Sequence, residues 1–171
     1  MKKALLIIDL QNDYFPGGNI PLWNTDATLV NIERAIISAK SKGIPVILVQ
    51  HIANPGIGAA PGFNRGTEGV KIHPRILAAA PQDPIVIKEH ADAFLKTNLE
   101  ELLARLGVDE LLVCGMMTQN CVTHTAISKS AEKYKVCVLT DCCTTVNEML
   151  HKIALNAIST RLPLALSKDA I

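Results

Sequence analysis

The sequence predicts a three-layer α/β/α protein with a six-stranded, mostly parallel sheet as its middle layer. Six apolar runs of strand length recur along the chain, and segments with helical periodicity separate most of them. Parallel strands joined by right-handed helical crossovers produce this alternation, so a Rossmann-like arrangement is expected. The expected strands are residues 3–9, 45–51, 84–88, 110–115, 136–141 and 162–166.

Capping residues place the ends of the expected helices. Thr25 or Asp26 can cap the first helix, whose apolar residues keep a helical spacing until Gly43 ends it. Residues 97–106 and 146–158 show similar spacing and are predicted to be helices. Only a short tail that ends at Ile171 follows the last strand.

Residues 51–76 interrupt the alternation with a long segment rich in Gly, Pro and Ala. Compact domains seldom carry a loop of this length without a function. The segment is either an insertion or a lid over the carboxyl ends of the strands, and we favour the lid.

Composition excludes several classes of protein. The chain of 171 residues fits one domain, 1–171. Hydrophobic residues make up 49% of it and the formal net charge is +1, so neither a nucleic-acid surface nor a membrane anchor is expected. No apolar run is long enough to span a bilayer, and the first residues lead into a strand rather than a signal peptide. We therefore expect a cytoplasmic protein.

The cysteines do not form a disulfide or zinc pattern. Their number is odd and no CxxC pair occurs. Cys142 and Cys143 follow Asp141 at the end of a predicted strand, where reduced thiols are the simple interpretation and a redox pair is the alternative. The five are Cys114, Cys121, Cys137, Cys142 and Cys143.

Cys121 follows a predicted strand and turn, close to the start of a helix-compatible segment. The positive end of a helix and its unpaired N–H groups favour a thiolate and can hold an oxyanion. Cys121 is therefore a candidate nucleophile. The competing interpretation is a small, buried hydrophobic residue.

Two charged residues end apolar runs. Asp9 follows the first run and Lys88 ends the third, so both are expected at the carboxyl ends of parallel strands, where open α/β sheets bind ligands. A structural ion pair at the sheet edge is the alternative for these two residues.

Together these residues resemble a known family. Ile8-Asp9-Leu10-Gln11-Asn12-Asp13-Tyr14-Phe15, Lys88 after its apolar run, and Gly115-Met116-Met117-Thr118-Gln119-Asn120-Cys121-Val122 look like motifs of the isochorismatase-like cysteine hydrolases, which include nicotinamidase and N-carbamoylsarcosine amidase. The resemblance runs from Lys3 to about Ser159. Gly66-Thr67-Glu68-Gly69 and Asp141-Cys142-Cys143-Thr144-Thr145 resemble lesser signatures of the metal-free branches.

The resemblance implies a triad of Asp9, Lys88 and Cys121. Lys88 and the helix start would lower the pKa of the Cys121 thiol, and the thiolate would add to an amide-type carbonyl. The backbone N–H groups of Cys121 and Met117 would form the oxyanion hole, with a cis peptide bond between Met116 and Met117. Asp9 would carry the proton from thiol to leaving amine and then activate water.

His124 offers a competing Cys/His dyad, because it lies three residues from Cys121. Side chains lean toward the helix start, however, so His124 is expected to pack or cap locally.

No metal and no cofactor are expected. Nicotinamidases carry Asp-x-His and further histidines after the second strand, whereas this chain has Val49-Gln50-His51-Ile52. A lone histidine is a poor divalent-ion site. We therefore expect His51, His73, His90 and His151 to be loop or surface residues.

The expected substrate is a small molecule in a small pocket. Polar and aromatic residues near the strand ends are tentative substrate contacts, although each could equally belong to the core or the surface. They are Gln11, Phe15, Phe63, Phe94, Gln119 and Asn120.

The leading hypothesis is a metal-free cysteine hydrolase that cleaves an amide-type C–N bond through a thioester. One alternative is the vinyl-ether hydrolysis of isochorismatase, which in that branch does not use the cysteine. The other is a non-catalytic ligand-binding or assembly module. The resemblance also implies a homo-oligomer, either dimer or tetramer.

Overall fold

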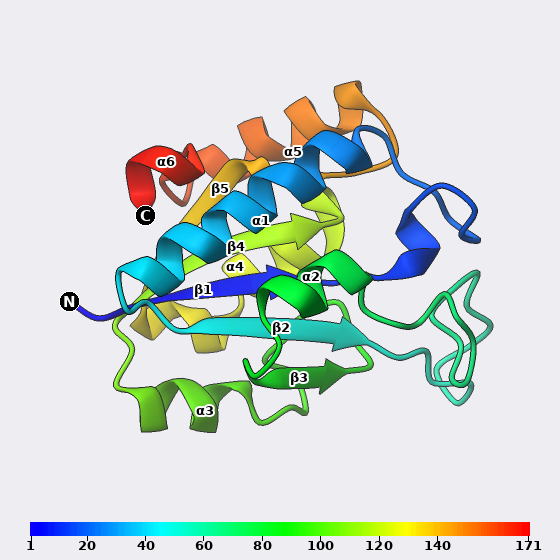
Figure 1. The fold of residues 1–171 in the computed structure, drawn as a ribbon, viewed down its shortest axis with the longest axis horizontal. Helices are drawn as coiled ribbons and strands as arrows, with labels where there is room; N and C mark the ends of the chain where they lie inside the picture. Colours follow the sequence, from blue (N-terminus) through cyan, green and yellow to red (C-terminus); the bar gives the residue numbers. More distant parts are fainter.

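The computed structural model describes residues 1–171 and has a six-stranded, entirely parallel sheet as its middle layer (Figure 1). The strand order is β3-β2-β1-β4-β5-β6, so the chain builds outward from β1 in two directions. This confirms the predicted fold class. The strands are β1 (Lys3–Ile8), β2 (Val46–His51), β3 (Ile85–Lys88), β4 (Glu110–Met116), β5 (Lys135–Thr144) and β6 (Leu164–Ala165).

Helices cover both faces of the sheet. In Figure 1, α1 and α2 lie in front of the strands and α4 lies behind them. The α-helices are α1 (Thr25–Ser41), α2 (Pro74–Ala79), α3 (Leu99–Leu106), α4 (Thr123–Ala126), α5 (Glu148–Ser159) and α6 (Ser167–Ala170). Three further short helices are the 3₁₀-helices η1 (Asn12–Tyr14) and η3 (Lys129–Lys133) and the single π-helical turn η2 (Thr118–Val122).

The apolar character of each strand follows its place in the sheet. In β1, at the centre, every residue after Lys3 is buried, as expected for a parallel strand covered on both faces. In β3, at the edge, Ile85 and Ile87 are exposed while Val86 and Lys88 are buried. Lys88 is therefore a charged residue that points to the interior.

Asparagine or glycine stands at several helix ends. Asn98 precedes α3 and Gly107 ends it with a φ of 67°. Asn147 caps α5 by accepting a hydrogen bond from the backbone N–H of Leu150. The N-cap of α1 is Asn24, in the left-handed region, rather than Thr25 or Asp26 as predicted.

Two expectations about the C-terminal third were wrong. β5 continues to Thr144, so Cys142 and Cys143 lie within a buried strand rather than beyond its end. This extension follows a register shift against β4 between Val113 and Gly115. The final strand is only β6, because Ser167 already starts α6.

The chain end packs against the core. The side chain of Ile171 is buried, and the ammonium groups of Lys3 and Lys42 donate to the last carbonyl groups. α2 was also not predicted; it begins at Pro74, and the His73 side chain caps it.

Residues 52–73 connect β2 to α2 and lie beyond the carboxyl ends of the strands (Figure 1). This is the region in which a lid was expected.

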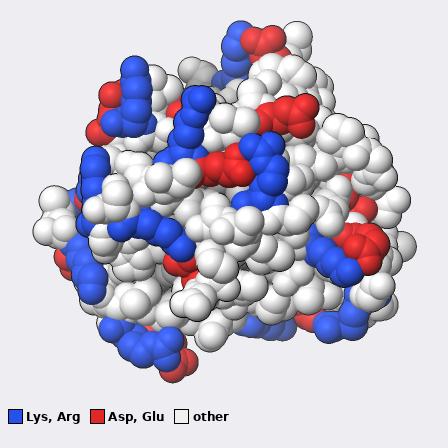
Figure 2. Space-filling view, in the orientation of Figure 1, with Lys and Arg blue, Asp and Glu red and all other residues white.

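No helix has both the length and the apolar character that crossing a bilayer requires. On the face shown in Figure 2, basic and acidic residues are scattered among uncharged ones, and neither sign forms a continuous field.

Candidate active site

The three residues of the predicted triad meet at the carboxyl ends of β1, β3 and β4. Asp9 follows β1 directly, with a φ of 56°, and Lys88 is the last residue of β3. Cys121 lies in η2, the turn that follows β4. Neighbouring parallel strands end at the same edge of the sheet, which brings these distant residues together.

Lys88 lies between the carboxylate and the sulfur. Its Nζ is 2.9 Å from Asp9 Oδ2 and 3.3 Å from Cys121 Sγ. The side chains of both Lys88 and Asp9 are completely buried. Asp9 Oδ1 is also buried and has no hydrogen-bond partner in the protein. A buried carboxylate oxygen without a partner is costly, and such groups are often functional.

The end of β4, where it passes close to β1, requires Gly115. A Cβ atom at this position would lie 2.1 Å from the carbonyl oxygen of Ile8, and the φ of Gly115 is 124°. The peptide bond between Met116 and Met117 is cis, as the resemblance implies. Met117 borders a cavity beside Cys121.

Burial and charge decide the protonation states of the triad. Burial, followed by the Asp9 carboxylate, raises the pKa of the Cys121 thiol, and Lys88 offsets only part of this effect. Burial works to lower the pKa of Lys88, but Asp9 and Cys121 outweigh it and the net shift is upward. The expectation of a lowered thiol pKa was therefore wrong for the resting site. Its stable form is a thiol beside a carboxylate–ammonium pair.

A cavity of about 180 Å³ opens on Cys121. Apolar groups form most of its wall, and none of its lining side chains carries a formal charge. It is lined by Tyr14, Ile20, His51, Ala60, Pro61, Gly62, Phe63, Met117, Asn120 and Cys121.

Asp13, which sequence reasoning missed, holds one wall of this cavity in place. Its buried carboxylate accepts hydrogen bonds from the backbone N–H groups of Phe63, at 2.6 Å, and Asn19, at 3.1 Å. A Cβ atom on Gly69 would lie 2.1 Å from Asp13 Oδ1, so only glycine fits there. The available signal was an acidic residue in the motif after the first strand.

His51 was wrongly expected to be a loop or surface residue. It ends β2, and its Nδ1 lies 2.9 Å from Lys88 Nζ. His73 caps α2, His90 supplies a carbonyl oxygen to Lys88, and the ring of His151 bonds to Thr118. Tyr14 was also missed; it lies beside the cavity, and burial followed by the charges of Asp9 and Cys121 raises its pKa.

Only two of the six tentative substrate contacts border the cavity, namely Phe63 and Asn120. Gln11 instead bonds to the backbone of His51 and Val70. Polar and aromatic residues near a strand end serve packing as readily as binding, which explains the misplaced assignments. Of the others, Phe15 packs on His73, Phe94 stacks near Tyr134, and Gln119 bonds to Thr145 and Met117.

Asp9, His51 and Cys121 each offer a potential metal-ligand atom, and these atoms lie within 4.8 Å of one another. Lys88 Nζ contacts all three residues. The Lys88 ammonium group thus already occupies the position between these potential ligand atoms, and a divalent ion would have to displace it.

His124 does not form a dyad with the nucleophile. Its ring is exposed, and its Nδ1 lies 2.9 Å from the carbonyl oxygen of Asn120. It is thus bound locally, as expected.

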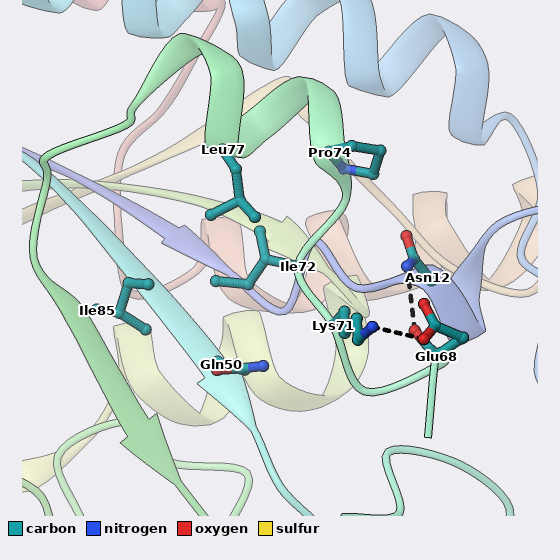
Figure 3. Close-up of a pocket in the computed structure, with 8 residues that line it drawn as sticks. All are labelled: Asn12, Gln50, Glu68, Lys71, Ile72, Pro74, Leu77 and Ile85. Atoms are coloured by element: carbon teal, nitrogen blue, oxygen red, sulfur yellow. Dashed lines mark hydrogen bonds and ion pairs between the residues drawn. The ribbon is translucent and has the colours of Figure 1, made fainter. Parts of the chain in front are cut away.

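A larger groove of about 390 Å³ lies between α2 and the strands β2 and β3 (Figure 3). Leu77 and Ile72 approach each other there, and Lys71 pairs with Glu68 at one end. No cysteine, histidine or buried charge borders it, so we place the chemistry at the smaller cavity.

Comparison with known proteins agrees with this geometry. The isochorismatase domain family matches residues 3–167. An uncharacterized isochorismatase family protein of Bacillus subtilis, YddQ, is 37% identical over 85% of this chain and 79% of its own length. The nicotinamidase of Escherichia coli is 33% identical over 85% of this chain and 84% of its own.

Solved structures show the same relationship. The crystal structure of a putative isochorismatase hydrolase from Oleispira antarctica superposes with a TM-score of 0.87 at 30% identity, covering 99% of this chain and 95% of the other. The protein described here therefore belongs to the isochorismatase family, a family of hydrolases that includes nicotinamidase.

Proposed function

We propose that this chain is a cysteine hydrolase that cleaves the C–N bond of a small amide through a thioester on Cys121. The observation that carries the proposal is the position of Lys88, buried between the Asp9 carboxylate and the Cys121 sulfur at the end of a small cavity. A buried ion pair beside a thiol is more typical of catalysis than of stabilisation.

Acylation begins with the thiol. Asp9 takes the proton from Cys121 as the sulfur attacks the carbonyl carbon, so an S–C bond forms while the C=O electrons move to oxygen. Lys88 stabilises the developing thiolate. The N–H groups of Met117 and Cys121 stabilise the oxyanion, after which Asp9 returns its proton to the leaving amine and the C–N bond breaks.

Deacylation uses the same groups. Asp9, again a carboxylate, removes a proton from water as the water oxygen attacks the thioester carbon. The C–S bond then breaks, and the proton returns to the sulfur. The products are a carboxylic acid and an amine or ammonia, and the resting thiol is restored.

The cavity limits the substrate to a small molecule, because about 180 Å³ holds little more than a single ring with its amide. Its uncharged lining favours an uncharged substrate. The relationship to a protein named nicotinamidase supports an amide as the reacting group.

Ammonia release from a panel of small primary amides tests this proposal. Wild type should turn over at least one amide, and Cys121→Ala should reduce its kcat by about 10³-fold or more. Cys137→Ala is the matched control, because Cys137 lies in β5 away from the cavity. Retained ammonia release by Cys121→Ala would contradict the thioester route. Cleavage of a vinyl ether that survives Cys121→Ala would favour the isochorismatase-type alternative. Absence of turnover with all amides would favour a binding module.

We also propose that the chain is one domain that forms a homo-oligomer, a dimer or tetramer. Size-exclusion chromatography with light scattering would measure its mass in solution, and a monomer at micromolar concentration would refute the oligomer.

A further inference from the structure

The ammonium group of Lys88 is surrounded by more hydrogen-bond acceptors than it has N–H donors. Besides Asp9 Oδ2 and Cys121 Sγ, its Nζ lies 2.9 Å from His51 Nδ1 and 3.1 Å from the carbonyl oxygen of His90. An ammonium group has three N–H donors and no acceptor. In the resting state the thiol needs no N–H from Lys88, so the three donors can serve the carboxylate, the carbonyl and the imidazole.

These contacts determine the tautomer of His51. Lys88 can only donate, so His51 Nδ1 must be the accepting, unprotonated nitrogen. Burial and then the charge of Lys88 lower the pKa of His51, which keeps the ring neutral. In a neutral imidazole with an accepting Nδ1, the hydrogen is on Nε2.

Both the backbone and the ring of His51 are held in place. Gln11 accepts from the backbone N–H of His51 at 2.8 Å and donates to its carbonyl oxygen at 2.7 Å. The Phe63 ring lies beside the imidazole, with 5.7 Å between ring centroids. Lys88 fixes the Nδ1 edge.

The remaining polar atom of the ring has no partner. No protein group accepts a hydrogen bond from Nε2, although His51 borders the cavity that opens on Cys121. The rest of that wall is mainly apolar, with Ile20, Pro61 and Met117 among its members. A fixed donor in an apolar wall discriminates strongly, because a ligand without an acceptor leaves the donor unpaired.

We propose that His51 is a specificity-determining residue whose Nε2–H donates a hydrogen bond to a neutral acceptor on the substrate. This inference rests on the proposed amidase function and narrows it. The substrate class is an uncharged amide that carries a second acceptor, such as a ring nitrogen or carbonyl oxygen, apart from the scissile group. His51 orients this end of the molecule while Cys121 attacks the other.

The test compares benzamide with its three pyridine analogues, picolinamide, nicotinamide and isonicotinamide. The four amides share one shape and differ in one ring nitrogen. For each amide we measure the concentration that halves the initial rate at which iodoacetamide alkylates Cys121. Peptide mapping identifies the alkylated cysteine. This readout reports binding beside the thiol and does not require turnover.

Two substitutions at His51 separate its two edges. In His51→Asn the amide oxygen can replace Nδ1 as the acceptor for Lys88, but the donor at Nε2 is lost. In His51→Gln the amide nitrogen can replace Nε2, and the Lys88 acceptor is lost. His124→Asn is the matched control, because that ring is exposed and lies outside the cavity.

For wild type and His124→Asn, we expect at least one pyridine isomer to protect Cys121 about fivefold to tenfold better than benzamide. His51→Asn should abolish this preference, whereas His51→Gln should retain it and change the pH profile of alkylation. An unchanged preference in His51→Asn, or a wild type in which no isomer outperforms benzamide, would overturn the inference. Protection that depends on His51 without turnover of any amide would instead refute the proposed function and keep the binding role.

Discussion

Two buried cysteines that lie beside an aspartate, Cys121 and Cys142, differ in their access to a cation and to a cavity. Asp9 and Cys121 share the cation of Lys88 and face a cavity. Asp141 and Cys142 lie within β5, where both carboxylate oxygens of Asp141 accept hydrogen bonds from Ser167, at 2.8 Å to its backbone N–H and 2.7 Å to its hydroxyl.

The cluster of Asp141 and Cys142 has a structural role, because it connects β5 to α6. Asp141 secures the first residue of α6, and burial followed by Asp141 raises the pKa of Cys142 with no cation to oppose it. A thiol therefore becomes a candidate nucleophile through a cation and access to a ligand, and a neighbouring carboxylate alone is insufficient. Substitutions at the two clusters should show whether the cation and the access to a ligand, rather than the carboxylate, make a thiol reactive.

The largest difference should be seen when each thiol is removed. Cys121→Ala should abolish alkylation of the cavity-facing thiol by iodoacetamide and any amide hydrolysis, whereas Cys142→Ala should leave both within about twofold of wild type. Peptide mapping of the alkylated protein provides the measurement. Loss of alkylation in Cys142→Ala at unchanged folding would show that the assignment is reversed.

The second largest difference is expected in stability, when a charged residue of each cluster is replaced. Lys88→Met leaves a buried Asp9 carboxylate unpaired and should lower the free energy of unfolding by about 3–5 kcal/mol. Asp141→Asn removes part of the acceptor capacity for Ser167 and should cost about 1–2 kcal/mol. Urea denaturation followed by circular dichroism measures both. Equal losses would mean that the two clusters have similar structural roles.

The buried thiols predict a loss of stability in alkali. Burial raises the pKa of Cys143 from its ordinary value of 9.0 to about 12. Between these values the unfolded chain loses a proton that the folded chain keeps, so the free energy of unfolding falls as pH rises. The slope is about 1.4 kcal/mol per pH unit for each such thiol.

Denaturation curves from pH 8 to 11 measure this slope, and Cys143→Ala should make it shallower. A slope that is the same in Cys143→Ala and wild type would refute the contribution of this thiol.

The smallest effect is expected at His124, the rejected dyad partner. His124→Ala should leave the pH profile of Cys121 alkylation unchanged, because the ring is exposed and bonded to the Asn120 carbonyl. Stopped-flow alkylation across pH checks this. A shifted profile would restore the Cys/His alternative.

Parts of the site could be predicted because parallel sheets place strand ends together. Asp9 and Lys88 each follow an apolar run, and Cys121 follows the strand and turn marked by Gly115. The resemblance to the family supplied the roles that position alone left open. The substrate contacts could not be predicted, because which side of a loop faces a cavity depends on packing, as the different positions of Phe15 and Phe63 show.

The sequence by itself determined the parallel α/β fold and the candidate nucleophile with its two charged neighbours. Buried parallel strands require apolar runs, and a charge at the end of a run is visible without any structure. Only the tertiary structure decided that His51 joins Lys88 and that Asp13 holds the loop at Phe63, contacts that span 37 and 50 residues. No local periodicity records such contacts, because they form only when distant strand ends and loops pack at one edge of the sheet.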